Sequence, residues 1–389
     1  MDLTPTPYLH ASDLHGLARL AVDGVAGTSH LVEHLHGTVA GFAAPLGPPA
    51  PDRTRGITGL VYRAVRGVNA TVGASIDAVA APVLARLPRP GRSEIREHWL
   101  AALNGVLGDH LATSNNPLAI PMSFRLDGEA LEIAHTALSE RIDEPSGKLL
   151  IAVHGLCMND LHWAKATASG RQRGMPARLG KALDFTPLYL HYNSGRRVDD
   201  NGGEFAALLE TLVDHWPVPV ESITILAHSM GGLLARSALD QGLRAGHRWP
   251  ESLDRMVYLG TPHHGAPLER AGHRFETLLG TSPYSAPFTR LGKIRSAGII
   301  DLRHGGLPVS DAGVEEFAIA ATARTRAGSL AGGLLGDELV PVDSALGRHP
   351  DPDRALGIPE DRCRVISGAG HVGLLHHPEV YRSLRRWLR

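Results

Sequence analysis

The sequence has only two cysteines, Cys157 and Cys363, in 389 residues, so a disulfide-stapled scaffold is excluded. An excess of charge is also missing, because 39 Lys and Arg balance 40 Asp and Glu. This balance argues against a nucleic-acid-binding protein, which usually carries a marked basic excess. The sequence contains neither a run of about 18 apolar residues nor an N-terminal signal peptide. We therefore expect a cytoplasmic protein whose thiols are reduced.

The second half of the sequence alternates short apolar runs with helical segments. The expected strands are Lys148–Gly155, Phe185–Gly195, Ser222–Gly232, Arg255–Gly265, Glu315–Ala323 and Cys363–His371. Continuous apolar strands that alternate with helices are typical of a parallel sheet covered on both faces. The sequence therefore predicts an α/β domain over 111–389 with a mostly parallel sheet and flanking helices. We expect a cap-like or lid-like insertion near 266–312, where periodicity is weak.

Residues 1–110 are rich in Ala, Gly and Val and predict a helical N-terminal extension. The Pro-rich segment 45–51 separates two helical stretches, and a third helix follows near 94–111. In the second stretch an apolar stripe follows a 4-4-3 spacing, and its members are Ile57, Val61, Val65, Val68, Val72, Ile76, Val79, Val83 and Leu87. This spacing keeps the stripe on one face of a helix. Two interpretations stay open: the stripe packs on the catalytic domain or a second subunit, or residues 1–90 contact a lipid surface peripherally.

The clearest chemical signal is Ala227-His228-Ser229-Met230-Gly231-Gly232, between an expected strand and an expected helix. A nucleophile on a tight strand-to-helix turn needs small residues two positions away on either side, and Ala227 and Gly231 meet this need. The following helix directs its N-terminus at Ser229, which favours developing negative charge there. We therefore expect Ser229 to be a nucleophile.

The expected strand at 148–155 ends in His154-Gly155. This is where enzymes with such a turn build half of an oxyanion hole. We expect the backbone N–H groups of Leu156 and Met230 to face the oxyanion, and Gly155 to allow close approach of the backbone.

A serine nucleophile needs an imidazole to take its proton and a carboxylate to orient that imidazole. His371, on the Gly-rich loop after the last expected strand, is the favoured base, with His376 and His377 as rivals. Asp337, which follows the strand at 315–323, is the favoured acid. Its rivals are Glu338, Asp343 and Asp311.

Five motifs in this order resemble α/β hydrolases of the lipase/esterase type, and in particular the bacterial triacylglycerol-lipase-like and PGAP-type deacylase-like group. They are LLIAVHG, AHSMGG, LGTPHHGAP, GDELVPVDSALG and GAGHVGLLHHPEVY. The resemblance covers about residues 145–389. It implies a Ser229–Asp337–His371 triad, an acyl-enzyme mechanism and a hydrophobic ester or lipid substrate. It also places His154, Gly155, His228, Thr261 and His263 at the substrate site. It implies no cofactor, and we expect no metal site.

Two other functions remain possible on the same sequence. An acyltransferase or a thioesterase would use the same triad, because the serine turn does not distinguish water from another acceptor. Alternatively, the chain is a lipid-surface or granule-surface protein in which residues 1–90 carry the main function. The oligomeric state is left open.

Overall fold

The structure, a computed structural model, describes residues 10–41, 54, 56–84, 93–167, 170–172, 174–265, 296–305, 313–322, 337 and 339–389. The chain divides into two compact units, which are Met1–Arg96 with Thr113–Ala119 and Glu97–Ala112 with Ile120–Arg389. Most of helix α3 (Glu94–Thr113) belongs to the second unit. The second unit therefore begins at Glu97, whereas we expected the helical extension to continue to residue 110.

Among the described residues, the second unit contains an eight-stranded sheet with the order β10-β9-β8-β7-β3-β6-β1-β2. Its strands are β1 (Ser123–Leu126), β2 (Glu129–Ala130), β3 (Lys148–Val153), β6 (Thr186–His191), β7 (Ser222–His228), β8 (Leu253–Leu259), β9 (Glu315–Thr322) and β10 (Cys363–Ser367). From β6 to β10 all neighbours are parallel, whereas β1 pairs antiparallel with β6 and β2. A separate hairpin is formed by β4 (Lys165–Thr167) and β5 (Gly170–Gln172). The mostly parallel sheet expected from the apolar runs is confirmed.

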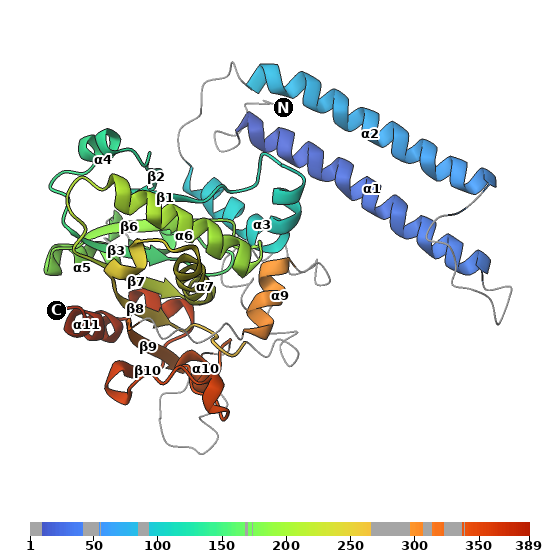
Figure 1. Ribbon diagram of the computed structural model, residues 1–389. Coiled ribbons are helices and arrows are strands. Elements are labelled where there is room, and N and C mark those ends of the chain that lie inside the picture. Colours follow the sequence, from blue (N-terminus) through green and yellow to red (C-terminus); the bar gives the residue numbers. More distant parts are fainter. Residues whose placement is uncertain are drawn as a thin grey trace. The chain divides into compact units, whose positions relative to one another are not determined.

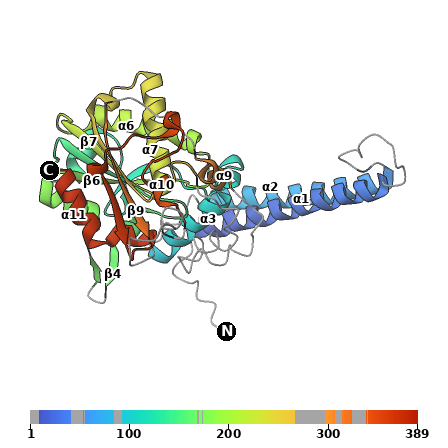
Figure 2. The ribbon, with the colours of Figure 1, turned by 90° about the horizontal axis from the view of Figure 1, so that it is seen from below.

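Helices cover both faces of this sheet (Figures 1 and 2). They are α4 (His135–Arg141), α5 (Met175–Leu183), α6 (Val198–His215), α7 (Met230–Ala245), α9 (Ala297–His304), α10 (Val342–Ala345) and α11 (Pro378–Trp387). Alternate residues of each strand point to opposite faces. Ile151 accordingly packs with Phe205 of α6 and Leu234 of α7 in one apolar cluster, whereas Leu150 packs with Val380 of α11 in the other. Of the expected insertion at 266–312, only 296–305 is described, and it contains α9.

The register brings the carboxyl ends of the central strands to one edge of the sheet. Val153 of β3 pairs with Ala227 of β7, and His228 pairs with Leu259 of β8. The segments that follow these strands therefore leave the sheet side by side. In open α/β sheets this edge is where ligands bind.

The first unit contains helices α1 (Ala11–Gly41) and α2 (Gly56–Leu84), which confirm the two expected helical stretches. His15, near the start of α1, contacts Asp77, near the end of α2. His36, near the end of α1, contacts Tyr62, near the start of α2. The two helices therefore run antiparallel as a hairpin.

Candidate active site

Ser229 lies between β7 and α7 in a strained backbone conformation. Its φ of 54° and ψ of −126° are unusual for a residue with a side chain. Its N–H donates to the Leu259 carbonyl at 2.9 Å, and its own carbonyl accepts from Gly232 at 3.0 Å. These bonds hold a sharp turn that directs the serine away from the strand at the start of a helix. The turn predicted from the sequence is therefore present.

Glycines next to this turn allow two segments of backbone to meet. A Cβ added at Gly155 would lie 2.9 Å from the Cβ of Ser229. A Cβ added at Gly231 would lie 2.6 Å from the carbonyl oxygen of His154. Both positions therefore require glycine if β3 and the serine turn are to pack this closely.

Asp337 and His371 form a buried pair. The Nδ1–H of His371 donates to Oδ2 of Asp337 at 2.5 Å, and each residue is 4% exposed. The other carboxylate oxygen accepts the N–H groups of Leu339 and Val340 at 3.0 and 2.8 Å. The carboxylate is therefore fixed from both sides, and the imidazole is held in the tautomer that leaves Nε2 free to accept a proton.

Two of the rival residues have other partners, and two lie outside the described residues. Asp343 is exposed and lies 3.7 Å from the Arg348 guanidinium. His377 caps α11, since its Nδ1 accepts the N–H of Glu379 at 3.3 Å. Glu338 and Asp311 lie outside the described residues.

The end of β8 brings Ser229 and His371 into one neighbourhood. Leu259 accepts the N–H of Ser229, and the next residue, Gly260, faces the imidazole of His371. A Cβ added at Gly260 would lie 3.1 Å from two atoms of that ring. Two consecutive residues of one strand end therefore contact the serine and the imidazole.

His228 lies beside this imidazole as a neutral group. Its ring centroid is 4.8 Å from that of His371, and its Nε2–H donates to the His371 carbonyl at 3.2 Å. Burial holds the pKa of His228 well below the usual range, and the proximity of His371 lowers it further. His228 therefore adds no positive charge that would oppose protonation of His371.

The two backbone N–H groups that the sequence predicts for the oxyanion belong to segments next to Ser229. Met230 is the first residue of α7, and Leu156 follows Gly155. The N–H groups of Leu156 and Met230 have no acceptor among the residues that the structure describes. Buried backbone N–H groups are nearly always hydrogen-bonded, so such donors fit a site that is completed by a ligand.

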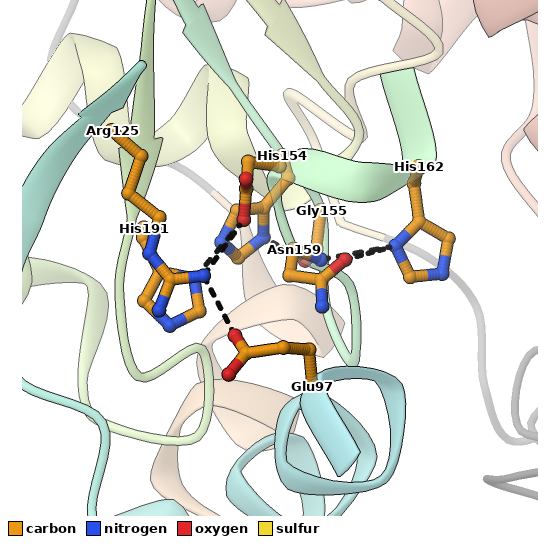
Figure 3. A network of polar contacts seen from close by, with 8 residues as sticks. Glu97, Arg125, His154, Gly155, Asn159, His162 and His191 are labelled. Atoms are coloured by element: carbon orange, nitrogen blue, oxygen red, sulfur yellow. Dashed lines mark hydrogen bonds and ion pairs between the residues drawn. The ribbon is translucent and has the colours of Figure 1, made fainter. Parts of the chain in front are cut away.

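A polar network supports the segment after β3 (Figure 3), and of its labelled residues only His154 and Gly155 were expected at the site from the sequence. Arg125 of β1 donates to Glu97 of α3 at 2.7 Å and to Asp160 of the loop at 3.1 Å. In the same segment, Oδ1 of Asn159 lies 2.8 Å from Nδ1 of His162. The contributing residues are far apart in the sequence, so no spacing pattern could have revealed the network.

His154, the residue after β3, lies beside this network (Figure 3). Its ring stacks on Tyr192 with centroids 4.3 Å apart, and its Nδ1–H donates to the Gly155 carbonyl at 2.9 Å. Burial lowers the pKa of His154 to about 4. His154 is therefore neutral at physiological pH and acts on the backbone next to Leu156.

Helix α3 packs against the same loop through glycines. A Cβ added at Gly105 would lie 2.2 Å from Sγ of Cys157, and one added at Gly108 would lie 1.8 Å from Oδ1 of Asn193. The Cys157 N–H donates to Oγ of Ser194 at 3.0 Å. Burial raises the pKa of the Cys157 thiol to about 12, so this cysteine is an inert packing residue.

The structure places Thr261 and His263 against α7. A Cβ added at Gly232 would lie 2.1 Å from Oγ1 of Thr261, and Arg236 donates to Nδ1 of His263 at 3.3 Å. Both residues are fully buried. Their expected role at the substrate site stays a prediction.

Comparisons with known proteins agree with this architecture. Residues 205–306 match a family model described as PGAP1-like alpha/beta domain. No curated protein matches the chain.

Several solved structures are similar in fold at low identity. The mature lipase BlEst2 of Bacillus licheniformis is 17% identical, with 69% of this chain and 98% of that chain covered and a TM-score of 0.41. The phospholipase PlaB of Legionella pneumophila is 15% identical, with 62% and 59% covered and a TM-score of 0.44. An esterase of Thermogutta terrifontis is 15% identical, with 69% and 93% covered and a TM-score of 0.39.

The sheet order and the serine turn define the fold most directly. The parallel strands follow the order β10-β9-β8-β7-β3-β6, and a serine occupies the sharp turn between β7 and α7. These features give the second unit an α/β-hydrolase fold, and the PGAP1-like match at 205–306 covers β7, the serine turn and α7 within it.

Proposed function

We propose that this protein is a serine hydrolase that cleaves carboxylic esters through an acyl-enzyme intermediate. The observation that carries the proposal is the buried Asp337–His371 pair at the sheet edge where Ser229 occupies its strained turn. A carboxylate, an imidazole and a serine that follow three different strands of one sheet in the sequence form the set of groups that acyl transfer requires.

In the first half of the reaction, Nε2 of His371 takes the proton of the Ser229 hydroxyl as its oxygen attacks the ester carbonyl. Asp337 stabilises the imidazolium that forms and keeps its proton on Nδ1. The N–H groups of Leu156 and Met230 bind the oxyanion of the tetrahedral intermediate, and each contributes about 3 kcal/mol to its stabilisation. The intermediate then collapses, His371 protonates the leaving alcohol, and the acyl group stays on Ser229.

In the second half, His371 removes a proton from water, which attacks the acyl-enzyme carbonyl. The same two N–H groups hold the second oxyanion, and the proton returns to Ser229 as the acid leaves. We propose an ester of a hydrophobic acid as substrate, since the five motifs resemble those of lipases and esterases.

The proposal is tested with Ser229→Ala and with Ser237→Ala, which changes another buried serine of α7. We expect Ser229→Ala to lower ester hydrolysis by about 10⁵-fold or more, because it removes the nucleophile. Covalent labelling by a fluorophosphonate is expected to disappear as well. Ser237→Ala should keep both activities. Labelling of Ser229→Ala at another residue, or hydrolysis that persists in it, would contradict the assignment.

A further inference from the structure

The hairpin of α1 and α2 places polar side chains between its two helices. Glu33 of α1 is 2% exposed, and it accepts hydrogen bonds from Arg66 of α2 and from Oγ1 of Thr54 (3.0 Å for Thr54). The hydrogen bond from Arg66 lowers the pKa of Glu33. The pair is therefore a charged contact in the interior of the hairpin.

Two further polar contacts join the helices. His15 contacts Asp77 at 2.7 Å, and Asn69 donates to the Val22 carbonyl at 2.8 Å. Helix α2 has three charged residues, Arg63, Arg66 and Asp77, and the last two of them are engaged with α1. The side of α2 that faces its partner is therefore its polar side.

The apolar stripe of α2 is exposed instead. Ile57, Val68 and Val79 are 82%, 66% and 68% exposed. We call the exposed residues of this stripe, together with three exposed residues of α1 that share one face of that helix, the valine face. It consists of Ile57, Val61, Val65, Val68, Val72 and Val79 of α2 with Leu14, Val25 and Val32 of α1.

The stripes of the two helices meet on one side of the hairpin. An apolar groove of about 640 Å³ runs between the helices there, and Leu14, Val72 and Val79 are among its lining residues. Residues 57 to 79 cover about 33 Å of helix at 1.5 Å per residue. A continuous apolar surface of this length is unusual on a soluble monomer, so it indicates an interaction.

The valine face carries no charge. Arg63 is two residues from both Val61 and Val65, which places it about 200° around the helix from them. Positions that flank the stripe, such as Ala64, Thr71 and Ser75, are exposed and neutral. A helix seam between protein subunits normally has flanking charges that set its register, and protein interfaces are enriched in aromatic residues and Arg.

We propose that the valine face docks on the acyl layer of a lipid surface, with the hairpin lying in the plane of that surface. In contact with lipid, polar groups must be satisfied within the protein while apolar side chains face outward. The hairpin has this distribution, since the Glu33–Arg66 and His15–Asp77 pairs lie between the helices and the valines lie outside. An amphipathic element with its apolar side chains on one face lies in the plane of a lipid surface. No helix in the described part of the chain is long and apolar enough to cross a bilayer.

The proposal is tested by flotation of the full-length protein with phosphatidylcholine vesicles. We expect binding that changes less than about twofold when salt rises from about 0.1 to about 0.5 M, because the face is uncharged. Addition of phosphatidylserine should likewise have little effect. The double variant Val68→Asp/Val72→Asp should weaken binding by about a hundredfold or more, since it replaces two valines of the lipid contact by two charged side chains.

The matched control is Ala70→Asp/Ala74→Asp, which adds the same charge to exposed positions of α2 away from the valine face. This control should bind vesicles like the original protein, and circular dichroism should show that both variants keep their helices. Absence of flotation, or equal loss in the two variants, would overturn the proposal. A dimer in lipid-free solution that Val68→Asp/Val72→Asp dissociates, without vesicle binding, would assign the face to a second copy. Hydrolysis of a short soluble ester is measured in parallel and should be unchanged in both variants, so the lipid proposal and the enzymatic proposal fail separately.

Discussion

The two units of this chain distribute polarity in opposite ways. We call the second unit, Glu97–Ala112 with Ile120–Arg389, the hydrolase unit after its fold. Its strands, such as β3, are buried on both faces, and buried His154, Ser229 and His371 follow the carboxyl ends of three of them. In the hairpin, the polar groups lie between two helices and the valines lie outside. Burial of apolar surface stabilises the hydrolase unit in water. The hairpin gains this stabilisation from its valine face only when another apolar surface covers that face.

The difference shows what a buried polar group indicates in each unit. In the hydrolase unit, Asp337 is surrounded by donors that fix its position next to His371. In the hairpin, Glu33 and Arg66 satisfy one another and expose no reactive atom. The hydrogen bonds of Asp337 orient the imidazole of His371, whereas the Glu33–Arg66 pair keeps two charged groups away from the outer surface of the hairpin.

The largest effect is expected on the hydrolysis rate, for a substitution of Asp337. Asp337→Asn should lower kcat by about 10⁴-fold, because an amide that donates to Nδ1 of His371 favours the wrong tautomer. The measurement is steady-state hydrolysis of a soluble ester. Asp343→Asn is the control, since the Asp343 carboxylate is exposed, and it should change kcat by less than about twofold. Similar losses in both variants would separate Asp337 from the chemistry.

Much of the hydrolase unit could be predicted from the sequence. Strands β3, β7 and β9 begin at the expected residues because a parallel sheet covered on both faces requires continuous apolar runs. The turn at Ser229 was visible because it needs small neighbours at fixed positions. Asp337 and His371 could be ranked only by their position after strands, and the structure then pairs them at 2.5 Å.

Other features had no local signal. The contact of Arg125 with Glu97 and Asp160 joins β1, α3 and the loop after β3, so it exists only once the chain has folded. The packing of α3 on the hydrolase unit depends on Gly105 and Gly108, whose fit against Cys157 and Asn193 leaves no pattern in the sequence. The 4-4-3 spacing predicted the stripe on α2, but periodicity does not tell whether a stripe faces protein or solvent.

An intermediate effect is expected on stability in acid. Burial lowers the pKa of His154 from 6.5 to about 4, and it holds the pKa of His228 and His263 well below 6.5. Below pH 6.5 the unfolded chain therefore binds protons that the folded chain does not, and stability falls as the pH falls. The loss for His154 should be about 2 kcal/mol between pH 6.5 and 5, and it should stop growing near pH 4.

Urea unfolding at pH 7 and pH 5, followed by tryptophan fluorescence, measures this loss. All five tryptophans lie in the hydrolase unit, so the signal reports that unit alone. His154→Gln removes one of the three titrating groups and should make the pH dependence shallower. A pH dependence that is unchanged in this variant would mean that His154 is protonated in the folded protein, contrary to its burial.

The smallest effect is expected on stability, for a substitution on the valine face. This prediction tests most directly the difference in burial between the two units. Val257→Ala, at a fully buried position of β8, should cost about 2 kcal/mol because it leaves a cavity. Val68→Ala should change the stability of α2 by less than about 0.5 kcal/mol, since Val68 is 66% exposed and alanine is the better helix former. Urea unfolding measures the first variant, and hydrogen exchange of the α2 amides measures the second. If Val68→Ala destabilised α2 as much as Val257→Ala destabilises the sheet, the valine face would already be covered in lipid-free solution, and the contrast between the two units would disappear.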